Sequence, residues 1–219
     1  MTIIRRIPIA FILASSLVLT RSFAVAAADN AARAGTLTLD SSQTQITFVL
    51  GGSLHTTHGT FELKSGTIQA DPATGKASGE IVVDTTGATT KESMRDSIMK
   101  NKVLETAQYP EITFTAQSVH GTLNPDGTFV ATISGTMTIH GDAHQVSFNT
   151  QGRLVGDHVT ASSTFTIPWI AWGMKDPSFL IFRVNDTVDV TFATAGQVTW
   201  GPAAGAAEAQ SAPAAAASH

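Results

Sequence analysis

The histidines are the residues of this chain whose spacing could support metal chemistry. His55 and His58 are three positions apart, and His140 and His144 are four apart across a predicted hairpin turn. A shared metal site needs three or four ligands that face one point. The chain has no cysteine, no carboxylate cluster accompanies either pair, and this spacing outside a helix gives no common face. We therefore expect no metal site, and a metal-dependent hydrolase is the least favoured function.

Arg95 and Asp96 form the next candidate, since adjacent charges of opposite sign could orient a charged group of a ligand. A salt bridge on a helix surface, or a tie to a neighbouring loop, is the simpler interpretation. The chain has no Gly-x-Ser-x-Gly elbow, no phosphate-binding loop, no dinucleotide fingerprint and no cysteine. The sequence offers no catalytic constellation, so we expect a protein that is not an enzyme and uses no cofactor.

The first 28 residues are typical of a secretory signal peptide. Arg5 and Arg6 precede an apolar run over 7–19, and small residues over 24–28 follow it. The run is shorter than the roughly 20 residues that span a bilayer, so a retained membrane anchor is the weaker interpretation. We expect cleavage after Ala26 or Ala28, a periplasmic or secreted product, and no stable membrane span after cleavage.

The rest of the chain divides into a short linker over 29–35, one folded domain over 36–200, and a tail over 201–219. The tail consists of Ala, Pro and small polar residues, so we expect it to be disordered, with an Ala-rich helix as the alternative. Loss of residues 1–28 removes three of the 13 basic residues and none of the 17 acidic ones, which moves the net charge from −4 to about −7. This charge argues against nucleic acid as a partner. The oligomeric state stays open, and a homodimer is one expectation.

Apolar residues recur at every second position through most of the domain, which is the pattern of a strand with one apolar face. The segments that show it are 46–50, 112–114, 129–139, 146–148, 159–167 and 188–192, and turn sequences lie at 71–72, 124–127, 140–142 and 156–157. Strands joined by such short turns form a meander, and a long meander protects its edges by closing. We expect an all-β fold, a closed antiparallel barrel of about eight strands, with a two-sheet sandwich as the alternative.

One charged segment interrupts the strands. Met94, Ile98 and Met99 recur at helical spacing within 89–101, and charged residues fill the other faces. Pro110 ends this segment and sets an extended entry into the next strand. We expect one short amphipathic helix that closes an end of the barrel through these three apolar side chains.

The same segment carries a resemblance to a known family. The stretch "RDSIMKNKVLETAQYPEITFTAQSV" over 95–119 is similar to a pattern of YceI-like exported proteins, and "GEIVVDTT", "GTMTIHGDAHQVSF" and "WGM" support it. The similarity spans roughly residues 35–199. It implies a lipocalin-like, eight-stranded antiparallel barrel whose interior holds a long isoprenoid chain.

The resemblance to this family makes the apolar face of each strand a candidate ligand-binding surface. The expected ligand-binding residues are Ile46, Phe48, Leu50, Ile81, Val83, Phe114, Ile133, Met137, Phe148, Phe165, Trp169, Trp172, Val190 and Phe192. An eight-stranded barrel either fills itself with side chains or keeps room for one slender ligand. Small residues on these faces, among them Ala131, Gly135, Ala161 and Ser163, favour an open interior.

The loop over 168–182 is too apolar for an ordinary connection. It contains Trp169, Trp172 and Met174, followed by Phe179 to Phe182, and it either plugs the barrel or forms the mouth through which an apolar ligand enters.

The sequence leaves two candidate functions. The first is an exported carrier or buffer of a polyisoprenoid or similar long apolar lipid, and the alternative is a stress-related structural or interaction barrel with a filled core and no ligand.

Overall fold

The computed structural model describes residues 33–178 and 183–201. Its elements are β1 (Gly35–Leu39), the 3-10 turn η1 (Ser41–Gln43), β2 (Gln45–Leu50), β3 (Thr57–Asp71), β4 (Lys76–Thr89), α2 (Ser93–Ile98), the π-helical turn η2 (Met99–Val103), β5 (Glu111–Leu123), β6 (Thr128–Ile139), β7 (Asp142–Val155), β8 (His158–Ile167) and β9 (Val188–Trp200). The expected signal peptide over 1–28 lies outside the described residues, as does the expected tail over 201–219 except for Gly201.

The strands form one antiparallel sheet in the order β1-β3-β2-β9-β8-β7-β6-β5-β4, which closes through pairing of β3 with β4. Both β1 and β2 lie between β3 and β9, since each pairs with both of those strands. They share one position in the wall, interrupted by η1, so the nine strands make a barrel of eight positions. The closed barrel with one short helix is therefore confirmed, and the sandwich is wrong.

Turn chemistry fixes the register of the hairpins. Between β6 and β7, His140 and Gly141 both have positive φ angles, 52° and 84°, which is the conformation of a tight hairpin turn whose twist matches its strands. The ladder then runs without a shift from Ile139↔Asp142 to Thr128↔Arg153. Because side chains alternate along each strand, this fixed register sends Ile133, Met137 and their parity partners to the inside of the barrel.

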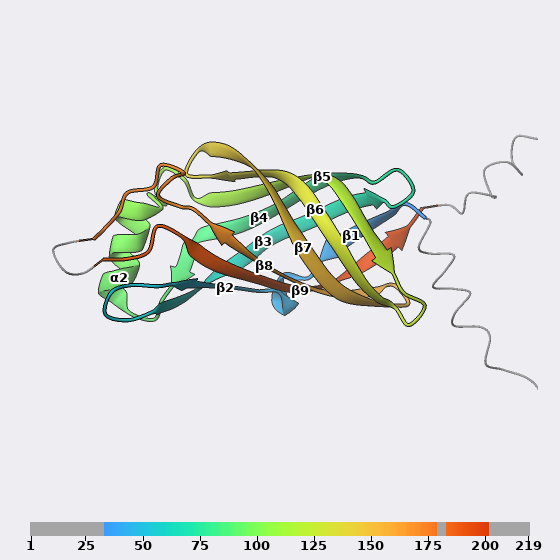
Figure 1. Ribbon diagram of the computed structural model, residues 1–219, viewed down its shortest axis with the longest axis horizontal. Coiled ribbons are helices and arrows are strands. Elements are labelled where there is room, and N and C mark those ends of the chain that lie inside the picture. Colours follow the sequence, from blue (N-terminus) through green and yellow to red (C-terminus); the bar gives the residue numbers. More distant parts are fainter. Residues whose placement is uncertain (1–32, 179–182, 202–219) are drawn as a thin grey trace, which may run out of the picture.

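The barrel is elongated, and its two ends differ (Figure 1). The segment of α2 and η2 lies across one end, where the loops before β3 and before β9 also gather. The described chain begins and ends at the opposite end, where Gly201 N–H donates to Ala34 C=O at 2.8 Å. We call these the helix end and the terminal end.

Candidate functional site: a bore along the barrel

A single cavity of about 1040 Å³ runs through the barrel. Its wall includes residues from both ends of the same strands, Phe129 and Ile139 of β6 and Val188 and Trp200 of β9, so it extends along the whole barrel. Most of the lining side chains are aliphatic or aromatic. The volume is at the top of the range of about 300–1,000 Å³ that holds drug-sized ligands, so the interior is a bore with room for a long molecule.

The structure places almost all of the sequence-predicted binding residues in the wall of this bore. These are Ile46, Phe48, Leu50, Ile81, Val83, Phe114, Ile133, Met137, Phe148, Phe165, Trp169, Val190 and Phe192. The exception is Trp172, whose ring stacks on His144 with centroids 4.0 Å apart and planes at 3°. Strand alternation fixes the direction of the barrel residues, whereas Trp172 lies in a loop, where no such rule applies.

Three phenylalanine rings form a continuous wall near the middle of the bore. The ring of Phe148 lies 5.3 Å from that of Phe114 and 4.9 Å from that of Phe165. Phe114 and Phe148 come from β5 and β7, and β6 separates these two strands. The rings meet because the Phe114 ring covers Gly135 of β6, which has no side chain. Gly135 therefore does not widen the bore as expected from its size, since Phe114 fills that space.

Inside the bore, beyond these rings, buried hydroxyl side chains also contribute to the lining. Thr150 and Ser163 are buried, and their hydroxyl oxygens lie 2.6 Å apart. Thr194 is a third buried hydroxyl, 2.6 Å from the hydroxyl of Thr44. Ala131 pairs with Thr150 across the β6–β7 ladder and leaves space on this side.

At the helix end, the lining of the bore is more polar than at the terminal end. The rim of this opening also has exposed apolar side chains. Leu54, Met94 and Ile98 line the cavity and are 62%, 72% and 37% exposed. Arg95 of α2 and Arg183 of the loop before β9 also line this end. No ion pair joins the Arg95 guanidinium to any residue of the described ranges. The end that α2 crosses thus combines exposed apolar side chains with two cations and with Glu92, the capping carboxylate of α2.

The placement of α2 corrects the expectation about its apolar face. Met94, at 72% exposed, does not anchor the helix, and Ile98 is also exposed. The anchors lie later, in η2 and just after it: Met99 and Val103 pack against the core, and Leu104 is 8% exposed. The π-helical turn causes the difference, since Leu104 N–H donates to Met99 C=O five residues back, and this wider turn rotates the later side chains toward the barrel.

Two carboxylates hold the start of α2. Glu92 accepts hydrogen bonds from the backbone N–H groups of Met94 and Arg95 and so caps the helix. Asp96 accepts from Thr89 Oγ1, Thr90 N and Thr90 Oγ1, each at 2.6 Å. Burial raises the pKa of Asp96, but these bonds together outweigh burial and the pKa is lowered. Asp96 is thus a tie to the neighbouring loop, one of the two simpler interpretations of the Arg95-Asp96 pair.

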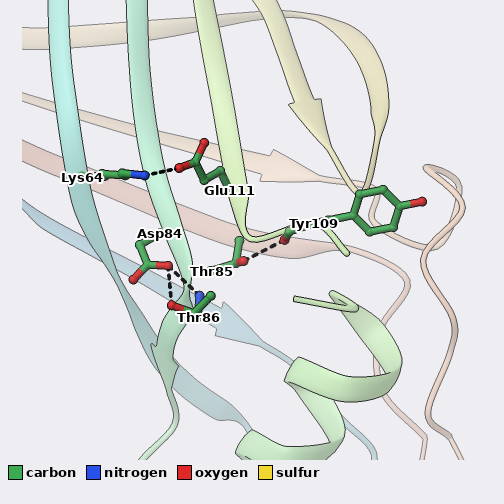
Figure 2. Close-up of polar contacts among 6 residues, drawn as sticks. All are labelled: Lys64, Asp84, Thr85, Thr86, Tyr109 and Glu111. Atoms are coloured by element: carbon green, nitrogen blue, oxygen red, sulfur yellow. Dashed lines mark hydrogen bonds and ion pairs between the residues drawn. The ribbon is translucent and has the colours of Figure 1, made fainter. Parts of the chain in front are cut away.

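The Tyr109-Pro110 segment is held from β4 (Figure 2). Thr85, which is fully buried, donates its hydroxyl to Tyr109 C=O at 2.9 Å, and Thr85 N–H donates to Pro110 C=O at 3.0 Å. The neighbouring Asp84 accepts from the N–H and hydroxyl of Thr86, and Lys64 of β3 pairs with Glu111 at the start of β5. These contacts fix the return of the chain from the helix into the wall.

Glu105 joins the helix segment to two further loops. Its carboxylate lies 2.7 Å from His140 Nε2 and 2.6 Å from Lys175 Nζ. The hydrogen bond from Lys175, followed by that with His140, lowers the pKa of Glu105. The ring of Tyr109 lies 4.5 Å from that of His140. Glu105 and its partners therefore tie the helix segment to the β6–β7 turn and to the loop after β8.

The described part of the apolar loop after β8 contributes to the wall of the bore. Trp169 and Met174 are buried and line the bore, and Trp169 Nε1–H donates to Asn185 C=O at 3.0 Å. Pro177 and Ser178 also line the bore near its opening. The described part of the loop therefore closes the wall, its role as an entrance for a ligand stays a prediction, and Phe179 to Phe182 lie outside the described residues.

The histidine pairs do not form sites. His140 bonds to Glu105 and His144 stacks on Trp172, while His55 and His58 are exposed. Over residues 33–178 and 183–201, no three His, Asp or Glu side chains are grouped closely enough to share a metal ion. In the same ranges no helix has the length and hydropathy to cross a membrane.

Sequence reasoning missed the lining of the terminal end. Leu37, Val198 and Trp200 line the bore there, together with Arg33, whose Nη2 donates to Gly201 C=O at 2.5 Å. The alternation of Val198 and Trp200 continues the parity of Val190 and Phe192, so extending the strand pattern to 200 would have included them.

The comparisons with known proteins agree with this architecture. A family model described as a YceI-like domain matches residues 37–195. The crystal structure of BcnA from Burkholderia cenocepacia is 19% identical, has a TM-score of 0.60, and covers 72% of this chain and 98% of its own. A polyisoprenoid binding domain from Saccharophagus degradans, implicated in plant cell wall breakdown, is 17% identical, with a TM-score of 0.55 and coverage of 74% and 98%. At these identities the solved structures show a shared fold alone.

The search of curated proteins gives no match. The family assignment rests on the family model, whose match covers most of the chain and includes every strand of the barrel at least in part. From this match, together with the barrel and its helix, the chain belongs to the YceI-like family.

Proposed function

We propose that this chain is an exported binding protein that holds a polyisoprenoid or similar long apolar lipid along the bore, as a carrier or buffer. The observation that supports it most is the continuous apolar cavity of about 1040 Å³. Burial of a chain in such a bore is favourable by about 0.8 kcal/mol for each methylene removed from water. The relative from Saccharophagus degradans, described as a polyisoprenoid binding domain, supports the same class of ligand.

The helix end is the proposed entrance. Leu54 and Met94 give it an exposed apolar rim at which a lipid chain can leave a membrane or another carrier. A polar or charged end of the lipid would then stay near Arg95 and Arg183, at the surface. No catalytic step is part of this proposal, because binding by burial needs none.

The direct test is extraction of the purified exported protein with organic solvent, followed by mass spectrometry. We expect a long-chain lipid in the wild type and its loss in Ala131→Phe, since the added ring fills the bore beside Thr150. Thr132→Phe is the matched control, because Thr132 is the next residue of β6 and is exposed on the outer face. It should retain the lipid and the wild-type melting temperature.

The filled-barrel function predicts a different result. In that case the wild type yields no lipid, and Ala131→Phe destabilises the protein by about 1–3 kcal/mol, as overpacking of a core does. This combination would exclude the carrier function.

Export has its own test. Signal peptidase cleavage in the small-residue stretch should give a mature chain that begins between Ala27 and Asp29. N-terminal sequencing of the protein from the exported fraction measures this directly, and Met1 at the N-terminus of that material would contradict export with cleavage.

A further inference from the structure

Two hydroxyl groups lie side by side deep within the apolar bore. Thr150 of β7 and Ser163 of β8 are a cross-strand pair, and both line the cavity. The exposed fractions of Thr150 and Ser163 are only 6% and 5%. Ser163 is four residues from Ile167, the last residue of β8 at the helix end, so the pair lies about 13 Å inward along the strand.

A count of protons shows that this pair has one donor left over. Each hydroxyl has one proton, and the single hydrogen bond between Thr150 and Ser163, at 2.6 Å, uses one of the two. The other proton meets no acceptor among the residues that the structure describes. A buried donor without a partner costs free energy, so this proton favours a ligand that can accept it.

The neighbouring hydroxyl pair shows the contrast. Thr44 Oγ1 lies 2.6 Å from Thr194 Oγ1, and Thr44 also donates to Asp40 C=O at 2.7 Å. The Thr194 hydroxyl is also within 3.2 Å of Ala195 C=O. Both protons of this pair therefore have acceptors within the protein, and no donor is left for a ligand.

The surroundings of Thr150 and Ser163 define what the partner can be. On the helix side, the stacked rings of Phe148 and Phe165 form the adjacent layer, and on the terminal side Gly152 pairs with Ala161. The cationic residues of the wall lie at its ends, Arg95 and Arg183 at the helix end and Arg33 at the terminal end. A charged group beside the hydroxyls would be buried without a counter-ion, whereas an uncharged acceptor would be satisfied.

We propose that the Thr150–Ser163 pair is a binding site for an uncharged carbonyl oxygen of the ligand. The ligand class is then a long apolar chain with a ketone or ester carbonyl that lies inside the bore, between the phenylalanine rings and the small residues beyond. The inference rests on the proposed lipid-binding function and adds the chemical group that the bore selects. A pure hydrocarbon would leave the free proton without an acceptor.

The test is a competition between two lipids of one carbon skeleton. Phosphatidylcholine vesicles that contain equal amounts of farnesylacetone, an isoprenoid methyl ketone, and the corresponding hydrocarbon are equilibrated with the delipidated mature protein. Mass spectrometry of the reisolated protein gives the bound ratio. The double variant Thr150→Val/Ser163→Ala should lower the ketone-to-hydrocarbon ratio about two- to tenfold relative to the wild type, the effect of one hydrogen bond. Both hydroxyls must be removed, because either one alone can donate.

The control variant loses a pair of hydroxyl groups on the outer face, in the same region of the wall. Thr164 of β8 and Thr191 of β9 face solvent, with their oxygens 3.2 Å apart, and Thr164→Val/Thr191→Val should leave the ratio unchanged. An unchanged ratio in the Thr150→Val/Ser163→Ala variant, with both lipids bound, would overturn this inference while the carrier function stands. A wild type that binds neither lipid would overturn both.

A second measurement avoids any variant. The carbonyl stretching band of farnesylacetone bound to the wild type should lie at lower frequency than in an alkane solvent, because a hydrogen bond weakens the C=O bond. A band at the alkane position in the bound ketone would overturn the inference even if the variants fail to fold.

Discussion

Aromatic rings cover three glycines in the wall of the barrel. A Cβ atom at Gly59 would lie 2.2 Å from the Phe48 ring, at Gly135 2.8 Å from the Phe114 ring, and at Gly152 2.6 Å from the Phe129 ring. Contacts this short do not occur in real structures. These positions therefore require glycine, because the aromatic ring occupies the space that a side chain would need.

Gly135 gives the sharpest prediction at this scale. In Gly135→Ala, the new methyl group would lie 2.3 Å from Thr115 C=O as well as against Phe114, so β5 or the ring must shift. We expect a loss of about 1–3 kcal/mol in the free energy of unfolding, measured in urea. Ser134→Ala, the adjacent outward position, should stay within about 0.5 kcal/mol of the wild type. Equal stabilities of the two variants would show that the ring can move freely.

The helix segment that crosses the barrel end behaves as an element with its own attachment. Its sequence predicted a helix correctly, since Met94, Ile98 and Met99 have helical spacing. Met99 packs against the core as predicted, but Met94 and Ile98 do not, because the turn widens at Met99 and Val103 and Leu104 provide the further anchors. Helical periodicity assumes a uniform turn, and a π-helical turn breaks that assumption.

This difference is testable with two truncations. Leu104→Ala removes a buried side chain that packs against the core, and we expect a loss of about 2–3 kcal/mol in the free energy of unfolding. Met94→Ala should have an effect below about 0.5 kcal/mol, because the side chain is exposed. Thermal and urea unfolding of both variants measures this. A larger loss of stability in Met94→Ala than in Leu104→Ala would show that Met94 anchors the helix, as its spacing predicted.

Acid should release the same element through Asp96. Its pKa is lower in the folded protein than the ordinary value of 3.8. The stabilisation is therefore complete above pH 3.8 and is lost as pH falls through the lower, folded pKa. We expect hydrogen exchange of residues 93–103 to accelerate in that range before the barrel strands exchange.

Two variants test the role of this carboxylate. Asp96→Asn should exchange faster over 93–103 at neutral pH, with about 1–2 kcal/mol less local stability, because the charge-assisted bonds from Thr89 and Thr90 are weakened. Asp126 accepts similar bonds from Thr128 at the terminal end, so Asp126→Asn is the matched control and should leave 93–103 unchanged. The same exchange in both variants would contradict a local role for Asp96.

At the scale of the whole molecule, an open bore links lipid content to stability. A lipid that binds only the folded barrel stabilises it by RT ln(1 + [L]/Kd), about 2.7 kcal/mol when the lipid is at 100 times its Kd. Delipidation should therefore lower the melting temperature, and return of the extracted lipid should restore it, as scanning calorimetry can measure. An identical melting curve before and after complete extraction would contradict a ligand within the bore.

The sequence predicted this architecture well in its periodic parts. Phe165, Ile133 and Val190 could be directed inward because strand alternation leaves only two choices for each residue. Whether the interior is open depends on how rings from different strands meet, such as Phe114 over Gly135, and one strand's sequence does not contain that information. Trp172, in a loop without a period, could not be directed at all.

The two ends of the described chain leave the barrel together, opposite α2 (Figure 1). Arg33 and Ala34 both contact Gly201 by hydrogen bonds, so the first and last strands finish at one point. A reporter protein or a surface linker joined directly after Gly201 would therefore leave the barrel at the end opposite α2. Immobilised in this way, the protein would present the proposed entrance to the medium, and lipid uptake from vesicles could be followed on a sensor chip without blocking the rim.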